Sequence, residues 1–257
     1  MIYNPNKKGT IILSHYRSGG TRLLNTTWLC IGEKNTSNFS EWNHSLSNTE
    51  KEVDTGTTNP SEHLYSLLKS TDKYSLILIN YPVDIVNFYQ NKVFDKLKDD
   101  YEVVVLERKD KVNCFLSLPL WEMFIKTGLF KNPKKWTKEN MMKFHKDMIN
   151  YKIGVDGLSL GYTTETPHIN GLLKSFISDI LMLRTISNEY NFPIIYYEDF
   201  ENNEEYFFKL FPNIDKEHVL NASKINNRKI PYVTNDYTEY YDEQVIKHLE
   251  GWKLNEL

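Results

Sequence analysis

The segment Thr10-Ile-Ile-Leu-Ser-His-Tyr-Arg-Ser-Gly-Gly-Thr21 joins a short apolar run to a turn with two adjacent glycines. The apolar run predicts a buried β-strand at residues 10–14, and the leucine and tryptophan spacing predicts a helix at residues 21–31. Backbone N–H groups in such a loop point inward, and the helix N-terminus adds partial positive charge. An ordinary strand-to-helix turn also uses glycine, but Arg17 and Thr21 favour an anion-binding loop.

Beyond this segment the chain alternates strand patterns with helix patterns. Buried strands are predicted at residues 74–80, 101–106 and 193–197, and helices at residues 83–97, 110–126, 138–151, 169–190, 204–211 and 238–249. Residues 32–60 lack periodicity and are interpreted as a long loop, with room for some local structure, and residues 152–167 form a glycine-bearing segment between two helices. The alternation favours a parallel sheet covered by helices on both faces. Without repeats or a clear linker, the sequence predicts one α/β domain with helical insertions.

Composition places the chain among soluble globular proteins. It has 257 residues, of which 25% are charged and 40% are hydrophobic. Its apolar runs fall far short of the roughly 20 residues that cross a bilayer, so no membrane span is expected. The N-terminus shows no export signal, and Cys30 and Cys114 are too few for a disulfide framework. We therefore expect a cytoplasmic protein.

The basic residues are mostly lysine. The net charge of −3 argues against a nucleic-acid partner and is compatible with a small anionic ligand. Of the 31 basic residues only five are arginine, at positions 17, 22, 108, 184 and 228. Arginine binds phosphate through a planar fork, whereas lysine mostly solvates a surface. The arginines therefore indicate where an anion would bind.

The glycine loop differs from that of kinases and NTPases. Their motif, G-x-x-x-x-G-K-[ST], places a lysine on the phosphates and a hydroxyl on Mg²⁺, and neither the spacing nor the lysine occurs here. The third predicted strand ends in Leu106-Glu107-Arg108 rather than in an aspartate for a metal. The loop therefore fits a phosphate or sulfate group handled without metal.

Three motifs follow one another along residues 10–200. The first is Arg17-Ser18-Gly19-Gly20-Thr21, the second is Arg108 with Ser117 nine residues later, and the third is Tyr197-Glu198-Asp199-Phe200. In type and order they resemble the motifs of sulfotransferases that use 3′-phosphoadenosine 5′-phosphosulfate (PAPS), especially the bacterial and phage carbohydrate-type members. In that family the first motif, (K/R)-S-G-(T/S/G)-T, binds the 5′-phosphosulfate, and the second binds the 3′-phosphate.

The resemblance implies a P-loop-like parallel β-sheet flanked by helices, in one sulfotransferase-like domain over residues 1–257. It implies PAPS as the sulfuryl donor, no metal, and a hydroxyl or amine of a small molecule, glycan or lipid as the acceptor. The residues expected to bind PAPS are Arg17, Ser18, Gly19, Gly20, Thr21, Arg22, Arg108, Ser117, Asn227 and Arg228. Asn227 and Arg228 are included because a basic C-terminal segment of the family covers the 3′-phosphate. The Arg-Lys-Gly form of that segment in cytosolic members is missing here, and a plain surface loop is the alternative.

Sulfuryl transfer resembles phosphoryl transfer, an in-line displacement in which the enzyme positions the reactants and stabilises developing charge. Arg17 is expected to supply that charge as a fixed cation. A base must take the acceptor's proton, and carbohydrate-type members of the family use a glutamate in the loop after the first helix. Glu41 matches that element, with His44 and then Glu33 as further candidates for the base. A solvated acid in a polar loop is the alternative for Glu41.

Two other functions remain open at the level of sequence. An ATP-dependent kinase of P-loop type would need Mg²⁺ and an acidic metal ligand, which the motifs do not supply. A non-catalytic nucleotide-binding protein would keep Arg108 and Ser117 and would tolerate Glu41→Gln without loss.

Overall fold

The computed structural model describes residues 1–42, 64–65, 68, 73–80, 82–126, 137–154, 169–225 and 236–257. By their contacts, the residues form two compact units. Unit 1 consists of Met1–Arg108 and Asp179–Asn227, and unit 2 consists of Lys109–Ser178 and Arg228–Leu257. The long helix α7 (Ile169–Tyr190) contributes residues to both. The single domain predicted over residues 1–257 is not tested by this division and stays a prediction.

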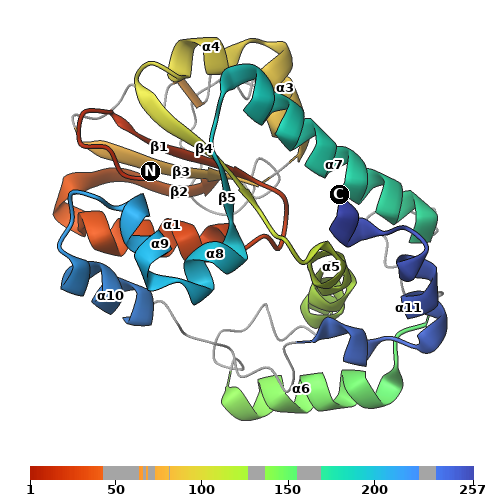
Figure 1. The fold of residues 1–257 in the computed structure, drawn as a ribbon. Helices are drawn as coiled ribbons and strands as arrows, with labels where there is room; N and C mark the ends of the chain where they lie inside the picture. The colour runs from red at the N-terminus through yellow and green to blue at the C-terminus, as the bar shows by residue number, and fades with distance from the viewer. Residues whose placement is uncertain are drawn as a thin grey trace. The chain divides into compact units, whose positions relative to one another are not determined.

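Unit 1 is built on a five-stranded parallel sheet. Its strands, in the spatial order β2-β3-β1-β4-β5, are β1 (Gly9–Ser14), β2 (Thr36–Trp42), β3 (Tyr74–Ile79), β4 (Tyr101–Glu107) and β5 (Ile194–Tyr196). The central strand β1 pairs its Leu13 with Ile79 of β3 and with Val105 of β4. Because every pairing is parallel, the carboxyl ends of all five strands meet at one edge (Figure 1). The predicted α/β fold, a parallel sheet flanked by helices, is confirmed.

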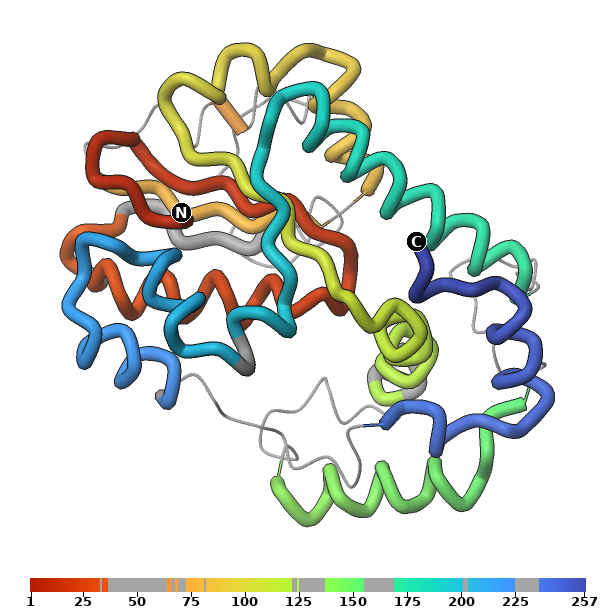
Figure 2. The backbone as a smooth tube through the Cα atoms, in the orientation of Figure 1, coloured from red at the N-terminus to blue at the C-terminus, as the bar shows by residue number. Residues whose placement is uncertain are grey.

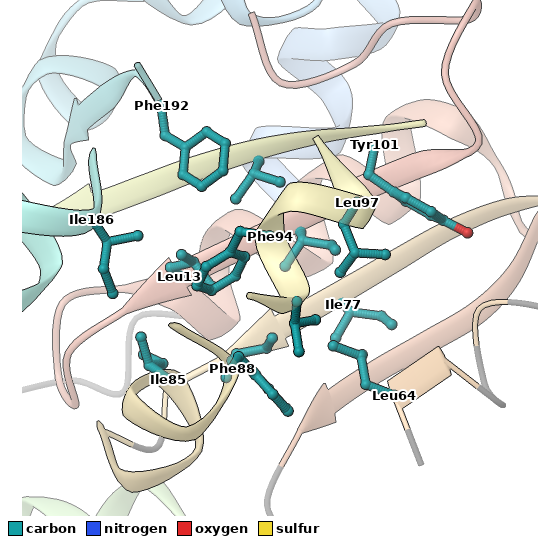
Figure 3. Packing of buried hydrophobic residues seen from close by; sticks show 14 of the residues in the cluster. Leu13, Leu64, Ile77, Ile85, Phe88, Phe94, Leu97, Tyr101, Ile186 and Phe192 are labelled. Carbon is teal, nitrogen blue, oxygen red and sulfur yellow. The ribbon is translucent and has the colours of Figure 1, made fainter. Parts of the chain in front are cut away.

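One face of the sheet is covered by α3 (Pro82–Gln90), α4 (Val93–Leu97) and the unit 1 part of α7. Side chains of a strand alternate between the two faces, so every second strand residue points to these helices. Figure 3 shows how Leu13 and Ile77 lie among Phe88, Phe94 and Ile186. The buried strand residues of this core are Ile11, Leu13, Ile77, Ile79, Tyr101, Val103 and Val105.

The other face of the sheet carries α1 (Gly20–Ile31), α8 (Tyr197–Asn202), α9 (Glu204–Leu210) and α10 (Lys216–Ile225) (Figure 1). The alternate strand residues Ile12, Leu78 and Leu106 are buried there with Leu23 and Phe207. Figure 2 traces the chain from β1 into α1 on this face and from β3 into α3 on the other. In open parallel sheets, ligands bind at the carboxyl ends of strands where neighbouring connections diverge in this way.

The described part of unit 2 is helical. It contains α5 (Lys111–Lys126), α6 (Lys138–Tyr151), the start of α7, α11 (Glu243–Glu250) and the 3-10 helices η5 (Tyr237–Tyr240) and η6 (Leu254–Glu256). The side chain of Asn255 accepts hydrogen bonds from the backbone N–H groups of Lys111 (2.8 Å) and Val112 (3.2 Å), so the C-terminal segment caps α5. Across the described residues of both units, no helix combines the length and apolar character that crossing a membrane requires.

Strand β2 corrects the prediction that residues 32–60 form a loop. After the 3-10 turn η1 (Glu33–Asn35), the segment Thr36-Ser-Asn-Phe-Ser-Glu-Trp42 pairs with β3 at the end of the sheet, with an irregularity between Thr36 and Phe39. The segment lacks the apolar run by which the other strands were recognised. Its conformation depends on backbone pairing with β3, a tertiary contact that a pattern of side chains does not reveal.

Two predicted helices are each divided in the structure. Residues 83–97 form α3 and α4, because Lys92 takes a left-handed conformation (φ 53°) and the Asn91 side chain donates to the carbonyl of Asn87 at 2.9 Å. Residues 238–249 begin as η5, and α11 starts anew after Asp242, whose carboxylate accepts from the Val245 N–H at 2.9 Å. Local capping by polar side chains ends or restarts the helix at both places.

Candidate functional site

The glycine loop between β1 and α1 is a tight turn at the carboxyl edge of the sheet. The N–H group and the hydroxyl of Ser18 both donate to the carbonyl of His15, at 3.3 and 2.6 Å. Arg17 and Gly19 have positive φ angles of 65° and 89°. Gly19 is the N-cap residue of α1. Because it has no side chain, it cannot cap the first N–H groups of the helix. The geometry therefore presents a helix N-terminus, with no acidic residue in its first turn, to an anion.

The two glycines allow close packing around the loop. A Cβ atom at Gly19 would lie 2.1 Å from Cδ2 of Tyr197, and one at Gly20 would lie 2.7 Å from Cδ1 of Leu78 and 3.0 Å from the hydroxyl oxygen of Ser14. Gly19 also needs its left-handed conformation. Glycine is thus required at both positions by neighbours that are distant in sequence, which the sequence motif alone did not reveal.

Ser14 is a buried polar residue beneath this loop. It is the last residue of β1 and is 1% exposed. Within the described residues its hydroxyl has no hydrogen-bond partner. Burying a hydroxyl without a partner is unfavourable, so its place against Gly20 marks it as a candidate to bind a ligand. Ser14 opens the segment Ser14–Thr21 between strand and helix, which the sequence predicts to bind an anion, but the burial of its hydroxyl is seen only in the structure.

Tyr197 brings two of the five arginines together. Arg22, on the first turns of α1, donates from Nη1 to the Tyr197 hydroxyl at 2.7 Å, and its Cζ lies 5.6 Å from the centre of the ring. Arg108 follows β4, and its Cζ lies 4.6 Å from the same ring centre. Both distances are within the range of a cation–π interaction. One aromatic ring therefore contacts two cations from different elements.

Glu198 forms an ion pair with Arg108, the second of these arginines. Nε of Arg108 donates to Oε1 of Glu198 at 3.1 Å, and each side chain is about one fifth exposed. Figure 1 shows that β5 leads directly into α8, where Tyr197 and Glu198 lie. Three predicted motifs, the glycine loop, the strand-end arginine and the tyrosine–glutamate segment, thus meet at the carboxyl edge of the sheet in unit 1.

An ion pair and a histidine–carboxylate contact lie next to this edge. Glu107, buried at the end of β4, is bound by Arg184 of α7 through Nε (2.9 and 3.2 Å) and Nη2 (2.8 Å). The hydrogen bonds to Glu107 raise the pKa of Arg184 above its usual value. The buried His15 donates from Nδ1 to the Tyr16 carbonyl at 2.8 Å, and its Nε2 lies 3.4 Å from a carboxylate oxygen of Asp179. The glycine loop and β4 are therefore both tied to α7.

The remaining glycine-loop residues lie at the surface of the edge. Arg17 is half-buried and Thr21 is exposed. Among the residues that the structure describes, no three histidine, cysteine, aspartate or glutamate side chains come together as they would to hold a metal ion. The cations, hydroxyls and N–H groups of this edge are suited to an anion, and its described carboxylates, Glu107, Asp179 and Glu198, lie against Arg184, His15 and Arg108.

Ser117 belongs to unit 2, whereas Arg108 ends the first segment of unit 1. Within its own unit, Ser117 is buried and donates from its hydroxyl to the carbonyl of Cys114 at 2.7 Å. This bond uses the donor of the hydroxyl and leaves its oxygen as an acceptor. The predicted pairing of Ser117 with Arg108 on one phosphate stays a prediction.

The candidate base Glu41 lies on β2, where its backbone pairs with Leu78 of β3. Two strand spacings separate β2 from β1, which is about 10 Å. The structure thus places Glu41 on a strand, and not in the loop after the first helix where the sequence predicted it. Its role as the base stays a prediction. Glu33 lies in η1. The other candidates, His44, Asn227 and Arg228, lie outside the described residues.

Comparison of the chain with models of protein families, with curated proteins and with solved structures gives no match.

Proposed function

We propose that the chain is a PAPS-dependent sulfotransferase that moves a sulfuryl group to a hydroxyl or amine of a small molecule, glycan or lipid. The observation that carries the proposal is the meeting of Arg22 and Arg108 on the ring of Tyr197. Arg108 and Tyr197 belong to two motifs of the resemblance, and Arg22 directly follows the third. Both arginines contact Tyr197 at the carboxyl edge of a parallel sheet. A ligand with two anionic groups, such as a nucleotide 3′-phosphate 5′-phosphosulfate, fits such a pair of cations.

The glycine loop supports a P-loop-like role in binding the 5′ end of the nucleotide. Residues Ser18 to Thr21 lead into the N-terminus of α1, whose N–H groups and dipole favour an anion. The buried hydroxyl of Ser14 faces Gly20 at the base of the loop. Arg17, from the same loop, is assigned to the charge that develops on the transferring oxygens.

In this proposal PAPS supplies an activated sulfuryl group on the 5′-phosphate. Glu41 accepts the proton of the acceptor as the acceptor's oxygen or nitrogen bonds to sulfur, and the sulfur–oxygen bond to the nucleotide breaks in line. The leaving phosphate takes the electron pair of that bond, and Arg17 stabilises its charge. Arg108 holds the 3′-phosphate, with Ser117, Asn227 and Arg228 assigned to the same group. No metal is assigned a role.

Titration calorimetry with adenosine 3′,5′-bisphosphate, alongside ATP and without added metal, tests the proposal. We expect micromolar binding of the bisphosphate, weak binding of ATP, and loss of bisphosphate binding of at least about 10-fold in Arg108→Ala, because a charge-assisted hydrogen bond to phosphate is lost. Lys8→Ala is the matched control. It removes one exposed cation at the opposite end of β1, where Lys8 pairs with Asp100 at 2.6 Å.

Binding of the bisphosphate would be followed by an acceptor screen with PAPS and by Glu41→Gln, which is expected to abolish transfer while preserving nucleotide binding. Transfer that survives Glu41→Gln would move the base to His44 or Glu33. Metal-dependent binding of ATP, with no binding of the bisphosphate, would overturn the proposal in favour of an ATP-dependent kinase.

A further inference from the structure

Arg22 and Arg108 come from elements that are far apart in the chain, and each is fixed by the segment that follows β5. Tyr197 accepts a hydrogen bond from Arg22 and contacts both guanidinium groups with its ring. Glu198 accepts from Nε of Arg108. Two consecutive residues therefore contact both cations of the candidate anion site.

Such contacts matter because an arginine side chain is long and flexible. Fixing one rotamer-rich side chain at the moment of binding weakens binding, and prior fixing removes that loss. Two neighbouring guanidinium groups also repel each other in the absence of a ligand. The negative face of the Tyr197 ring attracts both cations, and the Glu198 carboxylate offsets one of the two charges.

The position of Glu198 is unusual for a residue beside an anion site. A carboxylate repels a phosphate through space, so its charge alone would weaken ligand binding. Its hydrogen bond to Nε, however, sets the direction in which the planar guanidinium of Arg108 extends. Orientation of Arg108 is therefore the role that explains an acid at this place.

We propose that Tyr197 and Glu198 are positioning residues, which orient Arg22 and Arg108 before an anionic ligand arrives. The inference deepens the proposed function and rests on it for the identity of the ligand. The arrangement of the two arginines can nevertheless be measured without any ligand, so the two proposals can fail separately.

Paired variants of Glu198 distinguish orientation from charge. Glu198→Gln keeps an oxygen that accepts from Arg108, whereas Glu198→Ala removes it. If Glu198 orients Arg108, the Kd for adenosine 3′,5′-bisphosphate rises about 3- to 10-fold in Glu198→Ala and stays close to the wild-type value in Glu198→Gln. If Glu198 acts only through its charge, both variants bind the bisphosphate more tightly, and the inference is overturned.

The ligand-free measurement is the nitrogen–proton NMR spectrum of the arginine Nε–H groups. The chain has only five arginines, so each signal can be assigned by an arginine-to-lysine variant. We expect Glu198→Ala and Tyr197→Leu to shift and broaden the Arg108 signal, and Tyr197→Phe, which keeps the ring, to leave it nearly unchanged. The Arg184 signal, which reports the separate pair with Glu107, serves as the internal control for folding.

The outcomes separate the two proposals. An unchanged Arg108 signal in Glu198→Ala, with an intact Arg184 signal, overturns the positioning role. If the wild type does not bind the bisphosphate, the proposed function fails, while the NMR spectra still decide the positioning role. A changed Arg108 signal together with weaker binding in Glu198→Ala and rescue in Glu198→Gln supports both.

Discussion

Glu107 and Arg108 are consecutive residues at the end of β4, and each forms an ion pair of a different kind. Glu107 is 3% exposed at its side chain, and Arg184, which is 25% exposed, binds both of its carboxylate oxygens. Arg108 and Glu198 are 21% and 22% exposed and share one hydrogen bond of 3.1 Å. The pair with the buried carboxylate attaches the sheet to α7, whereas both members of the Arg108–Glu198 pair are partly exposed.

The difference follows from the faces of a strand and from solvent. Adjacent residues at a strand end point in opposite directions, so Glu107 reaches α7 while Arg108 reaches α8. A buried carboxylate needs complete pairing, because desolvation of an unpaired charge is very unfavourable. A partly exposed pair contributes little to stability. The same kind of ion pair therefore has a buried, fully paired carboxylate at one position and two partly exposed partners at the next.

The largest effect is expected from breaking the ion pair of Glu107 with Arg184. Arg184→Ala leaves the Glu107 carboxylate buried without its partner and should lower the free energy of unfolding by about 3–5 kcal/mol. Arg108→Ala, the matched change at the exposed pair, should lower it by less than about 1 kcal/mol while removing nucleotide binding. Urea denaturation of both variants measures the difference. Equal losses of stability would contradict the division of roles between the pairs.

The next effect in size comes from a buried polar group of unit 2, His145, and depends on pH. Its Nδ1 bonds the hydroxyl of the fully buried Tyr240 at 2.9 Å, and burial lowers the pKa of His145 from 6.5 to about 4. The unfolded chain therefore takes up this proton near pH 6.5, before the folded protein does. Stability is complete above pH 6.5 and falls as the pH drops toward 4, by roughly 3 kcal/mol from this residue.

Urea denaturation at pH 7 and at pH 4.5, in the wild type and in His145→Phe, measures this contribution as the difference between their pH slopes. The exposed-face variant His218→Gln is the control, since His218 lies at the surface on α10. Identical slopes in the wild type and His145→Phe would show that His145 does not carry the effect.

The smallest expected effect concerns two buried serines of the glycine loop. Ser14→Ala removes a hydroxyl that has no partner within the described residues and should raise the free energy of unfolding by about 1 kcal/mol, while weakening binding of the bisphosphate. Ser18→Ala removes a hydroxyl that donates to His15 and should lower the free energy of unfolding by a similar amount. Denaturation curves of the two variants test this difference in sign, and a loss of stability in Ser14→Ala would show that its hydroxyl is not left unpaired. An unchanged Kd for the bisphosphate in Ser14→Ala, measured by calorimetry, would contradict a ligand role for the hydroxyl.

Four of the five strands could be predicted from the sequence, because each of them is a buried apolar run. β2 could not, since Thr36–Trp42 joins the sheet through backbone pairing with β3. The helix breaks at Lys92 and Asp242 were missed for a related reason. Each depends on the conformation or the side-chain hydrogen bond of a single residue, and one residue hardly changes a periodic pattern.

The candidate site divides in the same way. Gly19, Gly20 and Arg108 could be named from their motifs, because a loop after a strand and a cation at a strand end are local features. Tyr197 could be named as part of a motif, but its contact with Gly19, Arg22 and Arg108 could not. Ser14 could be named only as the start of the loop segment, since a buried hydroxyl becomes informative only when its surroundings are known.

By itself, the sequence determined the alternation of strands and helices, the position of the glycine loop and the scarcity of arginine. Local spacing of apolar residues, glycine and charge suffices for these. Only the tertiary structure decided that Glu107 is buried against Arg184 while Arg108 lies against Tyr197 and Glu198. The physical reason is that these contacts join residues far apart in the sequence, 90 positions apart for Arg108 and Glu198. Such contacts form only because the parallel sheet brings the ends of its strands to one edge.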